Sequence, residues 1–350
     1  MKQYLLPKNG KFYKANLHHH TVLSDGEMGV EETKKAYMEK GYSIVAFTDH
    51  EVIIPHNDLS DENFLAITSF EIQVNPKKPA INWSYTKACH MNFYAKDKNN
   101  LICPAFDPKY LNCNWLAHTK EYATEEMYKH TTDRDHTTEC FNKMIKEANE
   151  AGFLVSYNHP VWNRHNYLDY SGLKGLWAVE CYNSGCAWGN LEDSITPVDA
   201  INALGERVVP IATDDTHYRR DAFGGWTMIK ADNLEYDTIL KAMEKGDLYA
   251  STGPEINELY LEDGVLHVKC SPAKIISFST ERRYGRRWVA ENEPLTQAEL
   301  DINHYFDTSR GVVSDMGVPF FRITITDFEG KKAYSRAYYV DEILEVAKNK

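Results

Sequence analysis

Histidine and carboxylate residues recur through the first two-thirds of the chain in short groups that could bind metal ions. The first group is LHHHTVLSDG, in which His18 and His20 flank a third histidine and Asp25 follows. Alternate residues on an extended strand point to the same side, so an H-x-H pair can hold one ion with both imidazoles. Alone, this pair is weak evidence, because most histidines at strand ends are caps or hydrogen-bonded core residues.

Further candidates follow in chain order, and each lies at or beside one end of a short apolar run. They are His50 after SIVAFT, Glu71 after FLAITSF, His90 at the start of HMNFYA, His159 after FLVSYN, and Asp215 with His217 after RVVPIAT. Imidazole and carboxylate without thiolate suit zinc, manganese or iron. Six histidines and three carboxylates exceed the needs of one tetrahedral site. We therefore expect two or three divalent metal ions with a bridging carboxylate.

The elements that must position these residues alternate between apolar runs and helix-period segments from residue 12 to about residue 253. The predicted strands are 43–48, 64–70, 90–95, 153–158, 176–182 and 207–213, and the predicted helices are 30–41, 139–152, 199–205 and 238–246, each ending at glycine. This alternation predicts a parallel α/β architecture, and its repetition favours a barrel. Because parallel barrels carry their active sites at the carboxyl ends of the strands, we expect the candidates on one rim.

Two parts of the chain depart from this alternation. Residues 96–137 are polar and aperiodic, and an insert of this length in a compact domain is typically a lid, a cap or a partly mobile loop. After YASTGP the sequence reads strand, Asp-Gly turn, strand, and a second strand–turn–strand follows at 320–340, which predicts a small antiparallel β domain. We divide the chain into a barrel of residues 1–253, with the 96–137 insert, and a β-rich domain of residues 254–350.

The composition is that of a folded, acidic protein: hydrophobic residues make up 43% and aromatic residues 12%, and the net charge is -12. This balance argues against an extended nucleic-acid surface or a membrane-surface protein. No run of 18 apolar residues predicts a membrane span, and the N-terminal segment lacks the apolar run of a signal peptide. Seven cysteines without a CxxC pair fit a reduced, cytoplasmic setting.

The ordered series LHHHTVLSDG, AFTDH, FE, CHMNFY, NHP and DDTH resembles the motif series of the PHP (polymerase and histidinol phosphatase) superfamily. The resemblance covers roughly residues 12–253, and the tail is similar to PHP proteins of the CehA/McbA-like branch, which carry an appended β domain. It implies a distorted (β/α)7 TIM-like barrel with a two- or three-metal centre. In that arrangement the first metal is held by His18, His20 and Asp215; Glu71 bridges it to a second, held also by His90 and His159; and a third is held by Asp25, His50 and His217.

Three positions depart from the family pattern, none of them at a presumed ligand. Asn16 stands where an aspartate often precedes the first pair, so a supporting carboxylate is expected to be missing. His19 adds a third imidazole, which strand alternation turns away from the cluster. Thr213-Asp214 replaces the usual Gly-Ser.

A second set of residues is expected to support the ligands or to bind substrate: Asp49, Asp214, Arg219, Arg220, Arg164, His165 and Asn183. Asp49, beside His50, would orient an imidazole. Arg219 and Arg220 follow the last ligand closely and could clamp a phosphate in a bidentate manner. The alternative for this pair is an exposed loop without a role at the site.

The leading hypothesis for the reaction is hydrolysis of a small phosphomonoester or a nucleotide phosphodiester. Divalent ions lower the pKa of bound water from about 15.7 to roughly 7, so a metal-bridging hydroxide is the expected nucleophile and no side-chain nucleophile is predicted. Three such ions would outweigh three ligand carboxylates in charge and attract a small anionic substrate.

Two alternatives remain open. The same cluster could hydrolyse a carbamate, ester or amide, or the chain could be a non-catalytic binding module with the barrel as scaffold. An arginine of the 219–220 pair aimed at the metals favours phosphate, whereas an apolar pocket roofed by the 96–137 insert favours a neutral substrate.

Overall fold

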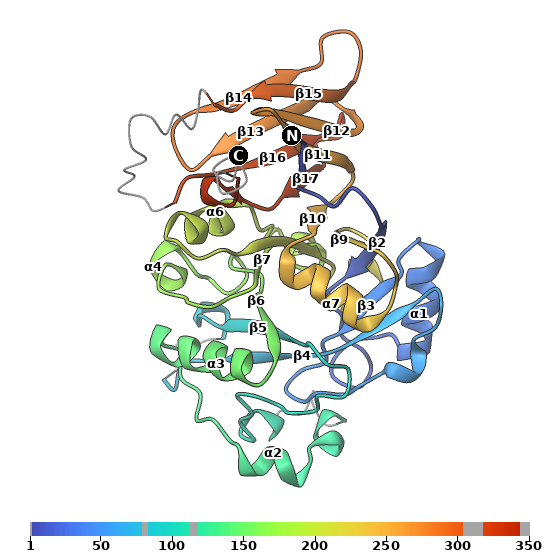
Figure 1. Ribbon diagram of the computed structural model, residues 1–350. Coiled ribbons are helices and arrows are strands. Elements are labelled where there is room, and N and C mark those ends of the chain that lie inside the picture. The colour runs from blue at the N-terminus through green and yellow to red at the C-terminus, as the bar shows by residue number, and fades with distance from the viewer. Residues whose placement is uncertain (1, 79–82, 113–117, 304–317, 344–350) are drawn as a thin grey trace.

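The computed structural model describes residues 2–78, 83–112, 118–303 and 318–343, and one large mixed sheet runs through it (Figure 1). The strands that carry the candidate residues and their neighbours are β2 (Lys11–Asn16), β3 (Ile44–Phe47), β4 (Leu65–Val74), β5 (Cys89–Ala95), β6 (Phe153–Tyr157), β7 (Ala178–Asn183), β8 (Val209–Thr213), β9 (Trp226–Ala231) and β10 (Leu248–Ser251). They lie in the order β10-β9-β2-β3-β4-β5-β6-β7-β8. All six strands predicted between residues 43 and 213 are present.

The helices pack on this sheet and include the four that glycine-terminated patterns predict. The described helices are α1 (Val30–Glu39), α2 (Glu125–Lys129), α3 (Thr138–Glu150), α4 (Tyr167–Tyr170), α5 (Ser184–Trp188), α6 (Thr196–Ala203) and α7 (Tyr236–Lys245). In α3 the Thr137 side chain caps the first turn by accepting from the Cys140 N–H. Gly246, with φ +74°, ends α7 in the left-handed conformation that glycine adopts most easily. No helix in the described ranges is both long enough and apolar enough to cross a membrane.

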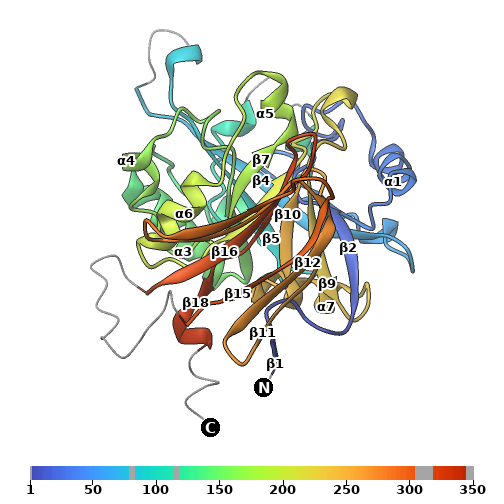
Figure 2. The same ribbon diagram turned by 90° about the horizontal axis from the view of Figure 1, so that it is seen from above.

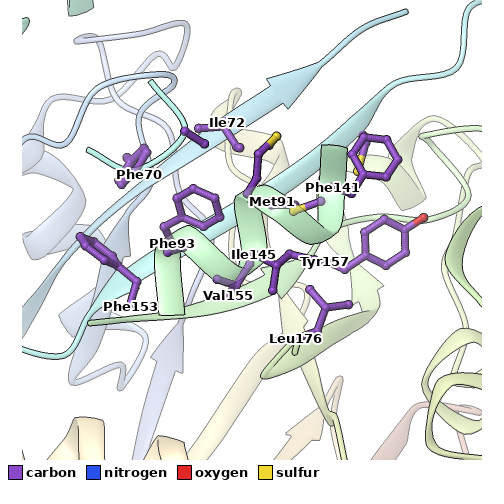
Figure 3. Packing of buried hydrophobic residues seen from close by; sticks show 14 of the residues in the cluster. Phe70, Ile72, Met91, Phe93, Phe141, Ile145, Phe153, Val155, Tyr157 and Leu176 are labelled. Atoms are coloured by element: carbon purple, nitrogen blue, oxygen red, sulfur yellow. The ribbon is translucent and has the colours of Figure 1, made fainter. Parts of the chain in front are cut away.

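A large apolar core lies between α3 and strands β4, β5 and β6 (Figure 3). The buried face of α3 consists of Phe141, Met144, Ile145 and Ala148, at the spacing of one helix face. On the sheet side Phe70, Met91 and Phe93 meet this face from neighbouring strands. Burying a side chain of this size contributes about 1.5–3 kcal/mol, so the core anchors the strands that lead into the candidate site.

The strand directions differ from the expected all-parallel arrangement at β5. Strands β2, β3 and β4 are parallel to one another, as are β6, β7 and β8. β5 is antiparallel to both of its neighbours, β4 and β6. In the β4–β5 register, Gln73 near the end of β4 pairs with His90 near the start of β5. As a result the start of β5, which carries His90, lies at the same edge as the carboxyl ends of the flanking strands.

The described strands do not form a closed barrel. β8 pairs with β7 and is the last strand at one end of the large sheet, so the hydrogen-bonded ladder stops there. β8 nevertheless approaches β9, where the Thr227 hydroxyl donates to the Ala212 carbonyl and accepts from the Ala212 N–H. Beyond the strand ends, His19 and Thr216 form a parallel bridge. The mixed α/β class is confirmed, and the (β/α)7 TIM-like barrel remains a prediction.

Antiparallel strands after Ser251, joined by the N-terminal strand β1, form two layers that lie across one end of the molecule (Figures 1 and 2). One layer is β1 (Lys2–Tyr4) with β11 (Ile256–Glu262), β12 (Val265–Ala273) and β15 (Leu295–Asp301); the other is β13 (Ile275–Thr280), β14 (Gly285–Val289), β16 (Phe320–Thr326), β17 (Lys332–Ser335) and β18 (Tyr338–Tyr339). β17 pairs with β10, so the second layer continues the large sheet. The predicted antiparallel strands are present, and the domain boundary after residue 253 remains a prediction.

Candidate metal centre

All nine predicted ligand residues come together at one end of the strands of the large sheet. Their ligand atoms form three overlapping groups, in each of which all the atoms lie within 4.8 Å of one another: His20, Asp25, His50 and His217; His18, His20 and Asp215; and His18, Glu71 and His159. His90 completes the set, with its Nδ1 3.2 Å from the Glu71 carboxylate. The groups differ from the expected sets: His20 joins the third set, and His18 takes the place of His90 in the second.

The spacing of these atoms is that of ligands around shared ions. His18 Nε2 and His20 Nε2 are 3.1 Å apart, and Asp215 Oδ1 lies 3.1 Å from the first and 3.2 Å from the second. Ligands bound at about 2.1 Å and separated by octahedral or tetrahedral angles are about 3.0–3.4 Å apart. The group of His18, His20 and Asp215 therefore has the geometry to hold one ion.

The Glu71 carboxylate lies between two groups of imidazoles. Its Oε1 is 3.2–3.5 Å from nitrogens of His18, His90 and His159, and its Oε2 is 3.3 Å from nitrogens of His20 and His50. One oxygen thus faces each group. This arrangement suits a carboxylate that bridges two ions.

The candidate site gathers buried carboxylates and imidazoles whose charges are strongly coupled. Glu71 and Asp215 are buried, and although burial opposes their ionisation, the neighbouring imidazoles, His18 foremost, hold the pKa of each carboxyl well below its usual range. Burial likewise opposes a charge on His20, yet hydrogen bonds to Asp215 and Glu71 raise its pKa to about 10. Neither carboxylate has a lysine or arginine partner in the ranges that the structure describes. Imidazole and carboxylate donors gathered without a lysine or arginine among them fit divalent ions.

Glu180 is a functional residue that the sequence analysis misses. It is fully buried in β7, where its Oε1 accepts from His18 Nδ1 and from the Thr213 hydroxyl, both at 2.7 Å. Its Oε2 accepts from the His159 backbone N–H at 2.8 Å. A carboxylate on Nδ1 fixes the tautomer of an imidazole and directs the free Nε2 toward a metal. Glu180 is therefore a supporting carboxylate for two predicted ligands, whereas position 16 supplies none.

Two asparagines connect this supporting layer to the ligands. The Asn183 side chain donates at 3.0 Å to both Asp215 and Glu180, which agrees with its expected place near the site. The Asn158 side chain, which the sequence analysis misses, donates to Glu71 Oε1 at 2.7 Å. These bonds fix the direction of both ligand carboxylates.

Residues that depart from the family pattern take structural roles. Asn16 accepts from the backbone N–H of Asp214 and donates to the Tyr37 hydroxyl. His19 points away from the cluster, as strand alternation predicts, and its Nε2 bonds to the Thr33 hydroxyl at 2.8 Å. Asp214 accepts from backbone N–H groups of residues 223–225 and so shapes the loop after the last ligands.

The expected role of Asp49 is corrected by its contacts. Its carboxylate accepts from the Thr21 N–H and hydroxyl and from the Ser24 hydroxyl, at 2.6–2.8 Å, rather than from an imidazole. The reason is the path of the chain after His20, which turns back over the end of β3. Asp49 thereby fixes the turn that presents Asp25.

The four expected substrate residues divide into one at the site and three elsewhere. Arg220 lines the cavity above the cluster. Arg219 pairs with Glu32, and Arg164 is exposed outside the cavity lining. The His165 ring bonds to Tyr157 and to His136 of the insert, because the chain after His159 turns away from the cluster.

A buried ion pair joins the insert to the region of the candidate site. A lid that moves freely would not have such a pair. Arg134 NH1 lies 2.7 Å from the Glu51 carboxylate, and both side chains are fully buried. The same guanidinium donates to the backbone carbonyls of Gln73 and Ala105. Because Glu51 follows the predicted ligand His50, the insert braces this part of the candidate centre. Figure 1 shows α2 of the insert at the end of the molecule opposite the C-terminal strands.

Above the cluster lies a cavity of about 720 Å³. Its walls include Gln73, Trp162, Trp188, Tyr218 and Arg220, and none of its described lining residues comes from the 96–137 insert. A volume of this size is in the range of sites for small molecules, roughly 300–1,000 Å³.

The fold and this donor set define a mixed α/β protein with a candidate multinuclear metal centre. No family model matches the chain, and no curated protein matches it. A two-domain protein from Bacteroides vulgatus, described as containing a predicted PHP-like metal-dependent phosphoesterase, is similar over 97% of this chain and 98% of its own, with 12% identity and a TM-score of 0.45.

Two further solved structures are similar over a smaller share of the chain. A candidate metal-dependent phosphoesterase from Bifidobacterium adolescentis matches 61% of this chain and 90% of its own, with 16% identity and a TM-score of 0.37. A lesion-specific endonuclease from Pyrococcus furiosus matches 67% of this chain and 56% of its own, with 16% identity and a TM-score of 0.41. PHP-like phosphoesterases are the class whose motifs the sequence resembles.

Proposed function

We propose that the protein is a metal-dependent phosphoesterase that hydrolyses a small phosphate ester. The observation that carries the proposal is the convergence of six imidazoles and three carboxylates beside a cavity of about 720 Å³, which all of them but His18 and His20 line. The cofactors would be two or three divalent ions of zinc, manganese or iron. When bound, such ions lower the pKa of water to roughly 7 and polarise a phosphoryl oxygen.

The chain's own residues have distinct parts in this proposal. Glu71 would be the bridging ligand, since its two oxygens face different imidazole groups. Glu180 keeps His18 in the tautomer that leaves Nε2 free. Asn158 and Asn183 hold the carboxylates of Glu71 and Asp215 in place, so the donor atoms are positioned before any ion or substrate binds.

The cavity walls favour phosphate over a neutral carbamate, ester or amide. Arg220 lines the cavity with its side chain exposed and 3.7 Å from the Asp221 carboxylate, and a guanidinium suits an anionic oxygen. The described part of the insert does not roof the cavity, so the feature that would indicate a neutral substrate is missing from its lining.

A substrate panel tests the proposal. Metal-free protein would be reloaded separately with zinc, manganese or iron and incubated with phosphomonoesters, nucleotide phosphodiesters, aryl carbamates and amides. We expect release of phosphate or alcohol from phosphate esters only, lost in Glu71→Gln and retained in Arg164→Ala, which changes an exposed residue outside the cavity. Turnover of carbamates alone would replace the proposal with the second candidate, and silence with every metal would refute both.

A metal-dependent enzyme and a non-catalytic binding module on the same fold differ in whether they hold metal ions. A non-catalytic module needs no metal centre, whereas the donor set here is complete. Elemental analysis of protein purified without chelator distinguishes the two: an enzyme of this type carries its ions, and a binding module carries none.

A further inference from the structure

Two exposed aromatic residues and an arginine form one edge of the cavity mouth. Trp188, Tyr218 and Arg220 all line the cavity, and we call them the aromatic rim. Trp188 is 63% exposed and Tyr218 is 50% exposed, so neither ring is part of the core. The Trp188 indole N–H donates to the Arg220 carbonyl at 2.8 Å, and the Arg220 guanidinium lies 4.7 Å from the centre of the Tyr218 ring. The indole is therefore held in a defined orientation while most of its surface faces solvent.

The aromatic rim is built on the same short elements that carry the ligands. Asn183, which contacts the ligand Asp215, also caps α5 by accepting from the Cys186 N–H, and α5 ends at Trp188. On the other side, Asp221 accepts from the backbone N–H groups of His217 and Tyr218. Short backbone segments and single hydrogen bonds connect the aromatic rim to the predicted metal ligands. The distance between the rim and the cluster is therefore fixed.

The other tryptophan of the cavity has a different surrounding. The Trp162 ring lies 4.9 Å from the His90 ring and 5.1 Å from the His159 ring, so it packs against ligand imidazoles. Trp188 is left as the broad aromatic surface at the mouth. Arg220 beside it is the one lysine or arginine among the described lining residues, where Asp25, Glu71, Asp215 and Asp221 supply negative charge.

These positions determine which part of a substrate would meet the rim. Under the proposed function the phosphoryl group lies at the cluster on the cavity floor, so the alcohol attached to it extends toward the mouth. Aromatic groups stack on an indole face, and a guanidinium prefers an anionic or hydrogen-bond-accepting edge. We infer that the aromatic rim binds the leaving group of the substrate, and that this group is a planar aromatic ring with a polar edge, stacked on Trp188 beside Arg220.

This inference rests on the proposed function, and its test uses two ligands that cannot be hydrolysed. Naphthylmethylphosphonate and decahydronaphthylmethylphosphonate carry the same anionic group on a planar and on a puckered ring system, respectively, with the same number of carbon atoms. Titration calorimetry of metal-loaded wild type should show the naphthyl compound binding about tenfold more tightly, a difference of about 1.4 kcal/mol that is near the upper end of aromatic stacking energies. Trp188→Ala should lower this preference to less than about twofold, while Trp188→Phe keeps part of it.

A matched control is Tyr284→Ala, since Tyr284 is 72% exposed on the turn between β13 and β14 and lies outside the cavity lining. It should leave both affinities unchanged. Equal affinity of wild type for the two phosphonates, or a preference that persists in Trp188→Ala, would overturn the inference and leave the proposed function standing. Failure of both phosphonates to bind the metal-loaded protein would count against the proposed function itself.

Discussion

Replacing Glu180 with glutamine should weaken metal binding without changing any ligand. Four donors meet its two oxygens: His18 Nδ1 and the Thr213 hydroxyl at Oε1, and the His159 N–H and the Asn183 amide at Oε2. A glutamine side chain has one acceptor oxygen, so its NH₂ group must face two of these donors whichever way it is turned.

The size of the effect follows from what these bonds do. The carboxylate fixes the tautomer of one presumed ligand, His18, and the backbone of another, His159. Loss of such supporting bonds costs metal affinity by a factor of about 10–100. At the site this corresponds to about 1.4–2.7 kcal/mol in binding free energy. Because the side chain keeps its length, we expect the fold to be retained.

The assay is competition between the metal-free protein and a chromophoric chelator for zinc and for manganese. Glu206→Gln is the matched control, since this residue accepts from the Gly175 N–H at 2.9 Å, away from the cavity lining. We expect wild-type affinity in the control and loss in Glu180→Gln. Affinities within twofold of wild type for every ion, in a variant whose circular dichroism is unchanged, would refute the reasoning.

Three more predictions concern the surroundings of the centre. His19→Gln should keep the full metal content by elemental analysis, because its imidazole bonds to Thr33; loss of an ion would contradict this. Arg134→Met leaves the buried Glu51 carboxylate without its cation and should lower the free energy of unfolding in urea by about 3–5 kcal/mol. Adding Glu51→Gln should recover much of this loss, because it removes the unpaired charge. If the double variant recovers no stability, the loss does not come from the unpaired Glu51 charge. Removing metal with a chelator should lower the melting temperature reversibly, since ions at 100 times their dissociation constant stabilise by about 2.7 kcal/mol; an unchanged melting curve would exclude bound ions.

Most of the predicted ligand residues could be found from the sequence because they lie at or near a strand end, and these strand ends meet in space. Glu71 and Asp25 are exceptions, since Glu71 lies inside β4 and Asp25 lies in the loop after β2. His90 shows where this reasoning is incomplete. It comes at the start of its strand, and reaches the cluster because β5 runs antiparallel to β4 and β6. Strand direction depends on the connection and on pairing partners far along the chain. The apolar pattern of 90–95 is the same for either direction.

Supporting residues were harder to predict because they act through single contacts. Glu180 does leave a signal, a lone acid inside the apolar run LWAVECY, since a charge there needs a buried partner. Its partner His18 is 162 residues away, and no spacing rule connects them. Arg134 is similar: it is one arginine in an aperiodic insert, and its pairing with Glu51 is a tertiary contact. Arg219 and Arg220 are adjacent in the chain, yet one pairs with Glu32 and the other lines the cavity.

The central claim is that the nine converging residues hold metal ions. Crystals of protein purified without chelator, measured at the absorption edges of zinc, manganese and iron, test it most directly. We expect two or three anomalous peaks among the imidazoles. One of them should lie between three atoms: His18 Nε2, His20 Nε2 and Asp215 Oδ1. Protein that shows no peak there after reloading with each metal would contradict it.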